Sequence, residues 1–279
     1  MICKHNYSFY KAEGGLRMGY ENITVERNGR LAIVSLNRSQ SMNAMDEIMM
    51  NELANCFEAL QNDSTIQVLM LKGSGKVFSA GGDIKAMLGN GVEGNIEIES
   101  IMLDISRMVK AFYSLPMVTI AAVHGAAAGL GFSLALAADI IIAEEDSKLA
   151  MNFIGIGLIP DGAGHFFMKE RLGVPKAKQM IWAGEVINGD VAKKLGLVDE
   201  VVESGTAVEQ AGQLAQKLLH SPLAAMIETK KILHTQKQAE LNEILKMESE
   251  TQTRMRKTAD HLEGIKAFVE KRSANFEGK

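Results

Sequence analysis

The pattern of apolar and polar positions is organised around residues 117–139. Within this stretch, the apolar run from Val118 to Val123 is short and rich in β-branched residues, and Pro116 and Gly125 bound it. These features predict a buried strand. A loop of small residues follows, and residues 132–138 are typical of a buried helix. The N-terminus of such a helix presents unpaired N–H groups, which can hold a phosphate or a developing oxyanion.

Elsewhere the pattern alternates strands and helices up to about residue 205 and is almost entirely helical beyond it. Asn28-Gly29, between two apolar runs, is a strong hairpin signal. Alternation of this kind indicates an α/β fold. The expected strands are residues 23–26, 31–36, 66–71, 140–143 and 197–202, and the expected helices are residues 45–60, 101–115, 175–183 and 190–195, with another beginning near Asp161. Residues 89–97 are rich in glycine and acidic side chains, which predicts a mobile loop.

Residues 76–85 repeat the arrangement of the central stretch, because they also follow an apolar strand and open a helix. Each stretch thus offers backbone N–H groups at the turn before a helix, which we call a cradle. Two such cradles can converge on one oxygen atom. A dinucleotide-binding fingerprint is excluded, since Leu134 occupies the position of its third glycine. A serine-hydrolase elbow is disfavoured, since a glycine-rich loop separates the strand from Ser133. A tight turn that needs small residues would explain one such stretch, but not the pair.

Composition narrows the class of protein. Of the 279 residues, 47% are hydrophobic and 23% are charged, as in ordinary globular enzymes. The net charge of −4 gives no electrostatic basis for binding nucleic acid. Cys3 and Cys56 are too few for a disulfide framework or a zinc site, and no apolar run is long enough to span a membrane. The N-terminus lacks the apolar core of a secretory signal. We therefore expect a cytoplasmic protein without a metal.

Short motifs along the chain resemble the enoyl-CoA hydratase/isomerase (crotonase) family over about residues 20 to 277. Each motif alone is modest, but their order and spacing together are specific. They are Asn37-Arg38 with Met42-Asn43-Ala44-Met45, Phe78-Ser79-Ala80-Gly81-Gly82-Asp83-Ile84, His124-Gly125 through Asp139, Gly157-Leu158-Ile159-Pro160-Asp161, Gly196-Leu197-Val198-Asp199, and Glu263-Gly264 through Phe268 with Glu270-Lys271-Arg272.

The resemblance implies an α/β core of repeated ββα turns wound into a spiral, which periodicity alone does not indicate. It divides the chain into an N-terminal extension (residues 1–18), a crotonase-like spiral core for CoA binding and catalysis (19–205) and a helical C-terminal part for oligomerisation (206–279). Because the family forms trimers that often pair into hexamers, a homotrimer or hexamer is expected. The expected substrate is an acyl-CoA thioester, with no cofactor beyond the coenzyme A of the substrate itself.

The resemblance also assigns the binding residues. The backbone N–H groups of Gly82 and Leu130 would form an oxyanion hole for the thioester carbonyl, which stabilises an enolate more than the ground state. Coenzyme A would be bound by Arg38, Ser41, Asn43, Ala44, Phe78, Ala80, Asp83, Ile84 and Lys85, with Phe268 and Lys271 reaching the CoA of a neighbouring subunit. Lys85 is explained equally well as a solvated side chain.

The group that moves the proton is the open question. Family hydratases use two glutamates, and the corresponding positions here are Ser133 and Phe153. Neither side chain takes a proton unaided at neutral pH. Asp161 follows Pro160, where isomerases of the family commonly carry an acidic residue, so we expect Asp161 to act as a single acid–base group. As an alternative, an Asp at this position would serve as a helix N-cap with no catalytic role.

His124, before Gly125, and His165, near Asp161, are explained more simply as structural residues than as acid–base groups. The expected function is that of a Δ3-Δ2-enoyl-CoA isomerase, which shifts a C=C bond through a dienolate. Two alternatives stay open. One is an enoyl-CoA hydratase, another CoA-thioester lyase or a ring-expanding isomerase, and the other is a non-catalytic relative that binds CoA or RNA.

Overall fold

The computed structural model describes residues 9–12, 15–85 and 98–279. The loop expected at residues 89–97 lies outside these ranges. The main sheet has the strand order β10-β8-β6-β5-β4-β3, and all its neighbours are parallel except β3 and β4. Its strands are β3 (Ile23–Asn28), β4 (Leu31–Leu36), β5 (Val68–Gly73), β6 (Val118–Val123), β8 (Ile140–Glu144) and β10 (Glu200–Val202). A separate hairpin of β1 (Phe9–Ala12) and β2 (Gly15–Met18) precedes them.

A second, smaller layer of extended backbone runs beside the main sheet. It contains the parallel pair β7 (Ala126–Ala128) and β9 (Lys148–Ala150), and it continues through single bridges from Ser79 to Ala127 and from Met45 to Gly82. Each long parallel strand is thus followed by a short extended segment, which is the ββα repeat that the resemblance implies. Part of the predicted small-residue loop forms β7 instead, and the strand expected at residues 197–202 is shorter, as β10.

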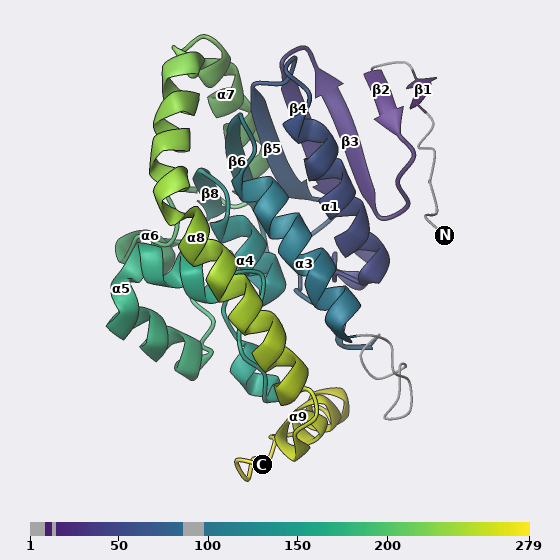
Figure 1. Ribbon diagram of the computed structural model, residues 1–279, viewed down its shortest axis with the longest axis vertical. Coiled ribbons are helices and arrows are strands. Elements are labelled where there is room, and N and C mark those ends of the chain that lie inside the picture. The colour runs from purple at the N-terminus through teal and green to yellow at the C-terminus, as the bar shows by residue number, and fades with distance from the viewer. Residues whose placement is uncertain (1–8, 13–14, 86–97) are drawn as a thin grey trace.

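Helices cover both faces of the main sheet, because its central strands are apolar on both sides. On β5, Leu69 and Leu71 face the layer of α1 (Glu47–Gln61) and α3 (Ile98–Tyr113), whereas Val68 and Met70 face α7 (Ala207–Leu219). Figure 1 shows α1 and α3 lying side by side over the sheet. The predicted C-terminal part therefore begins with a helix that packs on the core sheet.

The other helices of the described ranges follow β7 in the chain. They are α4 (Leu130–Leu136), α5 (Gly164–Ala183), α6 (Gly189–Leu195), α8 (Leu223–Met255) and α9 (Ala259–Glu270), and the short 3-10 turns are η1 (Ser39–Ser41) and η2 (Phe153–Ile156). In α5 the backbone kinks at Gly173, whose φ is 72°, just before Pro175. The 33-residue α8 packs against α3 and α5 and leads into α9, which packs on η2 (Figure 1). Within the described ranges, none of the helices is both long and apolar enough to cross a bilayer.

Candidate active site

A cavity of about 180 Å³ lies between the turns that follow β5 and β7 and the C-terminal ends of α8 and α9. It brings together six residues that the sequence analysis selected: Ala80, Gly82, Ile84, Leu130, Asp161 and Phe268. Its wall is mostly apolar, with Met50 of α1 and Ile105 of α3 on one side and Phe153, Ile156 and Leu158 on another. A cavity of this kind suits an acyl chain.

The backbone around Gly82 and Leu130 leaves two N–H groups available at this cavity. In the bridge beside Gly82, the Met45 nitrogen donates to the Gly81 oxygen (2.7 Å), and the Asp83 nitrogen donates to the Met45 oxygen (3.0 Å). The two hydrogen bonds of this bridge thus involve the backbone of Gly81 and Asp83, and the N–H group of Gly82 takes no part in them. Leu130 is the first residue of α4, where an N–H has no partner within the helix. In the described part of the chain, neither amide donates to another group, as two oxyanion-hole donors require.

Gly81 allows the two turns to approach closely. Its φ is +95°, and a Cβ atom placed on it would lie 2.6 Å from the Ala128 carbonyl oxygen and 3.6 Å from the Leu130 nitrogen. Ser79 joins the same turns, because its nitrogen donates to the Ala126 oxygen (2.9 Å) and its oxygen accepts from the Ala128 nitrogen (3.0 Å). The glycine therefore serves a close backbone contact between the two cradles.

Asp161 is 4% exposed and lines the cavity. Its Oδ2 accepts a hydrogen bond from Nε2 of Gln252 (3.1 Å). Its Oδ1 is buried and has no hydrogen-bond partner among the described residues. A buried carboxylate oxygen with no partner is rare, because desolvating it carries a large free-energy penalty, and it indicates a group held ready for a ligand.

The alternative that Asp161 caps α5 is wrong. The N-cap residue of α5 is Ala163, and no side chain of that segment caps the helix. The free N–H groups instead donate to Glu248 on α8: the Ala163 nitrogen to Oε2 (2.8 Å) and the His165 nitrogen to Oε1 (3.1 Å). Nδ1 of His165 also lies 2.8 Å from Oε1 of Glu248. The side chain of Glu248, and not that of Asp161, therefore caps the N-terminus of α5.

The surroundings of Asp161 raise its pKa from 3.8 to about 7. Burial is the largest cause, and the negative charge of Glu248 adds to it. The hydrogen bond from Gln252 and the charges of Arg256 and His165 act in the opposite direction but do not outweigh burial. A carboxyl group with a pKa near neutrality can both accept and return a proton, which is the property that an acid–base catalyst needs.

The sequence analysis missed three site residues: Glu248 and Gln252 of α8, and Arg256 at the C-cap of this helix. A signal for them exists in the sequence. They are spaced four residues apart and continue the buried stripe of Leu241 and Leu245, so that polar side chains occupy core-facing positions. Glu248 is 2% exposed and Gln252 is fully buried. Polar residues in the buried stripe of a helix indicate a site rather than a solvated face.

Ser133 and Phe153, which the resemblance aligns with the two family glutamates, bring no carboxylate to the site. The hydroxyl of Ser133 donates to the backbone oxygen of Asp161 (2.8 Å), so it supports the turn that carries the carboxylate. Phe153 lines the cavity with its ring. His124 lies elsewhere, with Nε2 3.2 Å from the Gly75 oxygen. In the described chain, Asp161 is the only carboxylate that lines the cavity.

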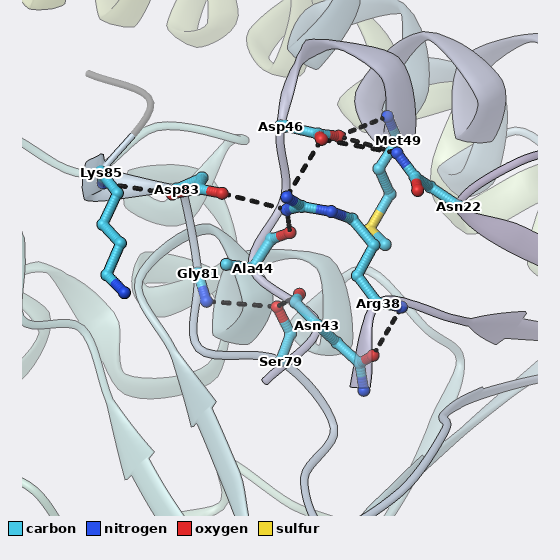
Figure 2. Close-up of polar contacts among 10 residues, drawn as sticks. All are labelled: Asn22, Arg38, Asn43, Ala44, Asp46, Met49, Ser79, Gly81, Asp83 and Lys85. Carbon is cyan, nitrogen blue, oxygen red and sulfur yellow. Dashed lines mark hydrogen bonds and ion pairs between the residues drawn. The ribbon is translucent and has the colours of Figure 1, made fainter. Parts of the chain in front are cut away.

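Arg38, a predicted phosphate contact, is held by carboxylates in this structure. Nη1 donates to Oδ2 of Asp83 (3.1 Å), and Nη2 lies 3.2 Å from Oδ2 of Asp46. Nη1 also donates to the Ala44 oxygen (2.5 Å). Figure 2 shows the guanidinium between the two acidic side chains. These ion pairs join Asp46, the N-cap residue of α1, to Asp83 in the turn after Gly82. Contact of Arg38 with a phosphate of CoA stays a prediction.

The other predicted CoA-binding residues lie outside the cavity wall. Asn43 is fully buried, and its Nδ2 donates to the oxygens of Ser74 and Val77, both at 2.9 Å. Phe78 is buried in the core, whereas Lys85 is exposed. The remaining members of this set are Ser41, Ala44, Asp83 and Lys271, and their roles stay predictions.

Phe268 is 58% exposed and lines the cavity of its own chain, so a site on one subunit already includes this residue of α9. The predicted contact with the CoA of a neighbouring subunit stays a prediction. Among residues 9–12, 15–85 and 98–279, no cluster of three or more His, Cys, Asp or Glu side chains could hold a metal ion.

Comparisons with known proteins agree with this geometry. A family model described as enoyl-CoA hydratase/isomerase matches residues 26–279. YhaR of Bacillus subtilis, which carries a provisional enoyl-CoA hydratase/isomerase name, is 45% identical over 250 residues, covering 90% of this chain and 96% of YhaR. The 1,2-epoxyphenylacetyl-CoA isomerase of Escherichia coli is 32% identical over 254 residues, covering 88% of this chain and 94% of that protein.

Among solved structures, an enoyl-CoA hydratase from Mycobacterium avium subsp. paratuberculosis matches with a TM-score of 0.84 at 29% identity, covering 93% of this chain and 100% of that one. The fold is therefore the crotonase fold expected from the motifs. The names of the relatives include both hydratases and isomerases, so they do not separate the two reactions.

Proposed function

We propose that this chain, which belongs to the enoyl-CoA hydratase/isomerase family, is an enzyme that shifts a C=C bond in an acyl-CoA thioester with Asp161 as its single acid–base group. The observation that carries the proposal is the carboxylate of Asp161, which lines the cavity beside Gly82 and Leu130 with a buried oxygen that has no partner among the described residues. The family acts on acyl-CoA thioesters. Our proposal goes further and names isomerisation as the reaction of this protein.

In this reaction the carboxylate of Asp161 removes a proton from carbon 2 of a 3-enoyl thioester. The electron pair of the broken C–H bond moves into the thioester, and the N–H groups of Gly82 and Leu130 stabilise the negative charge on its oxygen. The protonated Asp161 then returns the proton to carbon 4, and the C=C bond now lies between carbons 2 and 3. No water and no second carboxylate takes part.

Hydration is the less well supported reaction. It needs one group to activate water and another to protonate the adjacent carbon. Ser133 already donates to backbone, and Phe153 has no acid–base group. The described cavity wall offers Asp161 alone.

The test is the reaction of purified protein with trans-3-hexenoyl-CoA and, separately, with crotonyl-CoA. We expect conjugated-thioester absorbance to rise with the first substrate and no change of product mass with the second. Addition of water to crotonyl-CoA, seen as a mass increase of one water molecule, would contradict the single-carboxylate assignment. If the protein binds neither thioester and binds RNA instead, the enzymatic proposal fails.

The rate of the double-bond shift should rise with pH through about pH 7. The carboxylate must be ionised to take the proton, and its pKa is raised to about 7. At pH 6 only about a tenth of the molecules would therefore carry the active form. The measurement is kcat/KM against pH from 5 to 9 with 3-hexenoyl-CoA. A profile that is flat from pH 5 to 8 would mean that an ordinary, low pKa governs the base.

Glu248→Gln should move the rising limb of this profile to lower pH, because the negative charge of Glu248 raises the pKa of Asp161. The amide oxygen of Gln can still accept from the Ala163 nitrogen, so the cap of α5 is partly kept. Glu250→Gln removes the same charge from an exposed position on the same helix and should leave the profile in place. A shift with both variants, or with neither, would contradict the role of Glu248.

Assembly as a homotrimer or hexamer is a further expectation from the resemblance. A cytoplasmic location is expected from the composition.

A further inference from the structure

Arg256 is the one cationic side chain, in the described part of the chain, that lines the cavity. It caps the C-terminus of α8, one turn beyond Gln252. Its Nε is shielded from solvent and has no hydrogen-bond partner among the residues that the structure describes. No hydrogen bond or ion pair to its guanidinium occurs within the described ranges, so the cation enters the cavity wall unpaired.

Neither nearby carboxylate neutralises Arg256 by direct contact. Asp161 and Glu47 act on it electrostatically, but neither forms an ion pair with it in this structure. Oδ2 of Asp161 is bound by Gln252 instead. Nε is the nitrogen of this guanidinium that is shielded from water without a partner among the described residues, and burying a polar donor in that way carries a free-energy cost. A side chain kept in that state at a cavity wall is best explained by a partner that arrives with the ligand.

The chemistry of the wall indicates what that partner is. The cavity that Arg256 lines is otherwise lined mostly by apolar side chains, among them Ile156, Leu158 and Phe268. Such a wall accepts the methylene groups of an acyl chain, while a guanidinium recognises a carboxylate through paired N–H donors. The apolar wall and the guanidinium together fit an acyl chain that is apolar along its length and carries a negative charge away from the thioester.

We propose that Arg256 binds a carboxylate at the far end of the acyl chain, so that the substrate is the CoA monothioester of an unsaturated dicarboxylic acid. This inference rests on the proposed function for its reaction, but the binding of the carboxylate is independent of it. Arg256 is then a specificity-determining residue, while Asp161, Gly82 and Leu130 carry out the chemistry.

The first experiment compares two substrates of equal chain length. Trans-3-hexenoyl-CoA ends in a methyl group, and the monothioester of trans-3-hexenedioic acid ends in a carboxylate. We expect kcat/KM for double-bond isomerisation to be at least tenfold higher with the carboxylate-bearing substrate at low salt. Equal or lower kcat/KM with that substrate would overturn the proposal.

Substitutions then test whether Arg256 causes the preference. Arg256→Met should bring the ratio of the two kcat/KM values down to about one, and Arg256→Lys should restore part of it. The ratio is the informative quantity, because a changed pKa of Asp161 would affect both substrates alike. Arg254→Met is the matched control, since Arg254 is exposed on the same helix and its Nη2 donates to Oγ1 of Thr251 (3.1 Å). A preference that survives Arg256→Met would overturn the assignment.

A binding measurement separates this inference from the proposed reaction. Adipyl-CoA and hexanoyl-CoA are saturated, so neither can undergo a double-bond shift. By calorimetry, wild-type protein should bind adipyl-CoA at least tenfold more tightly, and Arg256→Met should remove the difference. If neither enoyl substrate reacts but this difference holds, the isomerase proposal fails and the carboxylate site stands. Equal affinity of the wild type for the two saturated thioesters would overturn the site itself.

Discussion

Asp161→Asn lowers kcat for the isomerisation of 3-hexenoyl-CoA by about 10³-fold, equivalent to about 4 kcal/mol of lost transition-state stabilisation. The amide keeps the size of the side chain but cannot take a proton from carbon 2. KM should change little, since the cavity wall and the two N–H donors are preserved. Because Asn before Gly162 can deamidate back to Asp, Asp161→Ala is measured beside it and should lose at least as much activity.

Thermal stability shows that the loss is catalytic and not a loss of folding. The raised pKa means that the folded state holds the proton of Asp161 more tightly than the unfolded chain does. The stability from this proton is fully present below about pH 4 and is lost as pH rises through about 7. Relative to wild type, Asp161→Asn should therefore gain about 2 to 3 kcal/mol between pH 5 and pH 8. An inactive variant without this gain has been disturbed elsewhere, and a fully active variant would rule out Asp161 as the base.

Gly81→Ala should lower kcat by roughly 10²- to 10³-fold, the range typical for the loss of one oxyanion-hole donor. The new Cβ would lie 2.6 Å from the Ala128 oxygen, so one of the two turns that carry the Gly82 and Leu130 donors must move. A displacement of about 1 Å at such donors is enough for a loss of this size. Steady-state kinetics with 3-hexenoyl-CoA measures the effect, which should fall mainly on kcat.

A second glycine separates backbone strain from the close approach. Gly205 also has a positive φ, +83°, but a Cβ atom on it would meet nothing within 4 Å. Gly205→Ala should therefore retain full activity and lose only about 1 kcal/mol of folding stability. If Gly81→Ala is folded and as active as Gly205→Ala, the close contact of the two turns is not needed for catalysis.

The sequence was a good guide to elements with strong local signals. The Asn28-Gly29 hairpin and the strand from Val118 to Val123 lie where the pattern places them, and the helix predicted at residues 132–138 is α4, which begins two residues earlier. Asp161 was also found from the sequence, because it stands beside a proline turn that the family motif marks. These features depend on neighbours that are close in the chain, which is what a pattern can report.

The parts that the sequence left open depend on contacts between distant segments. Asp161 does not cap α5 because Glu248, more than eighty residues away in the chain, takes over the cap. The three extended residues of β7 are held by pairing with β9, which a run of alanines does not reveal. Arg256 lines a cavity together with Met50 of α1 and Ile105 of α3, which are far from it in the chain.

The buried polar stripe of α8 limits how the length of this helix can vary during evolution. Inserting one residue between 223 and 248 would turn everything beyond it by about 100° and advance it by about 1.5 Å. The helix would stay helical, yet Glu248, Gln252 and Arg256 would all leave the site at once. Adding two whole turns would restore the direction but displace the three side chains by about 10 Å along the axis. Insertions and deletions in descendants of this sequence should therefore fall before Leu223 or after Arg256, while the segment between them keeps its residue count.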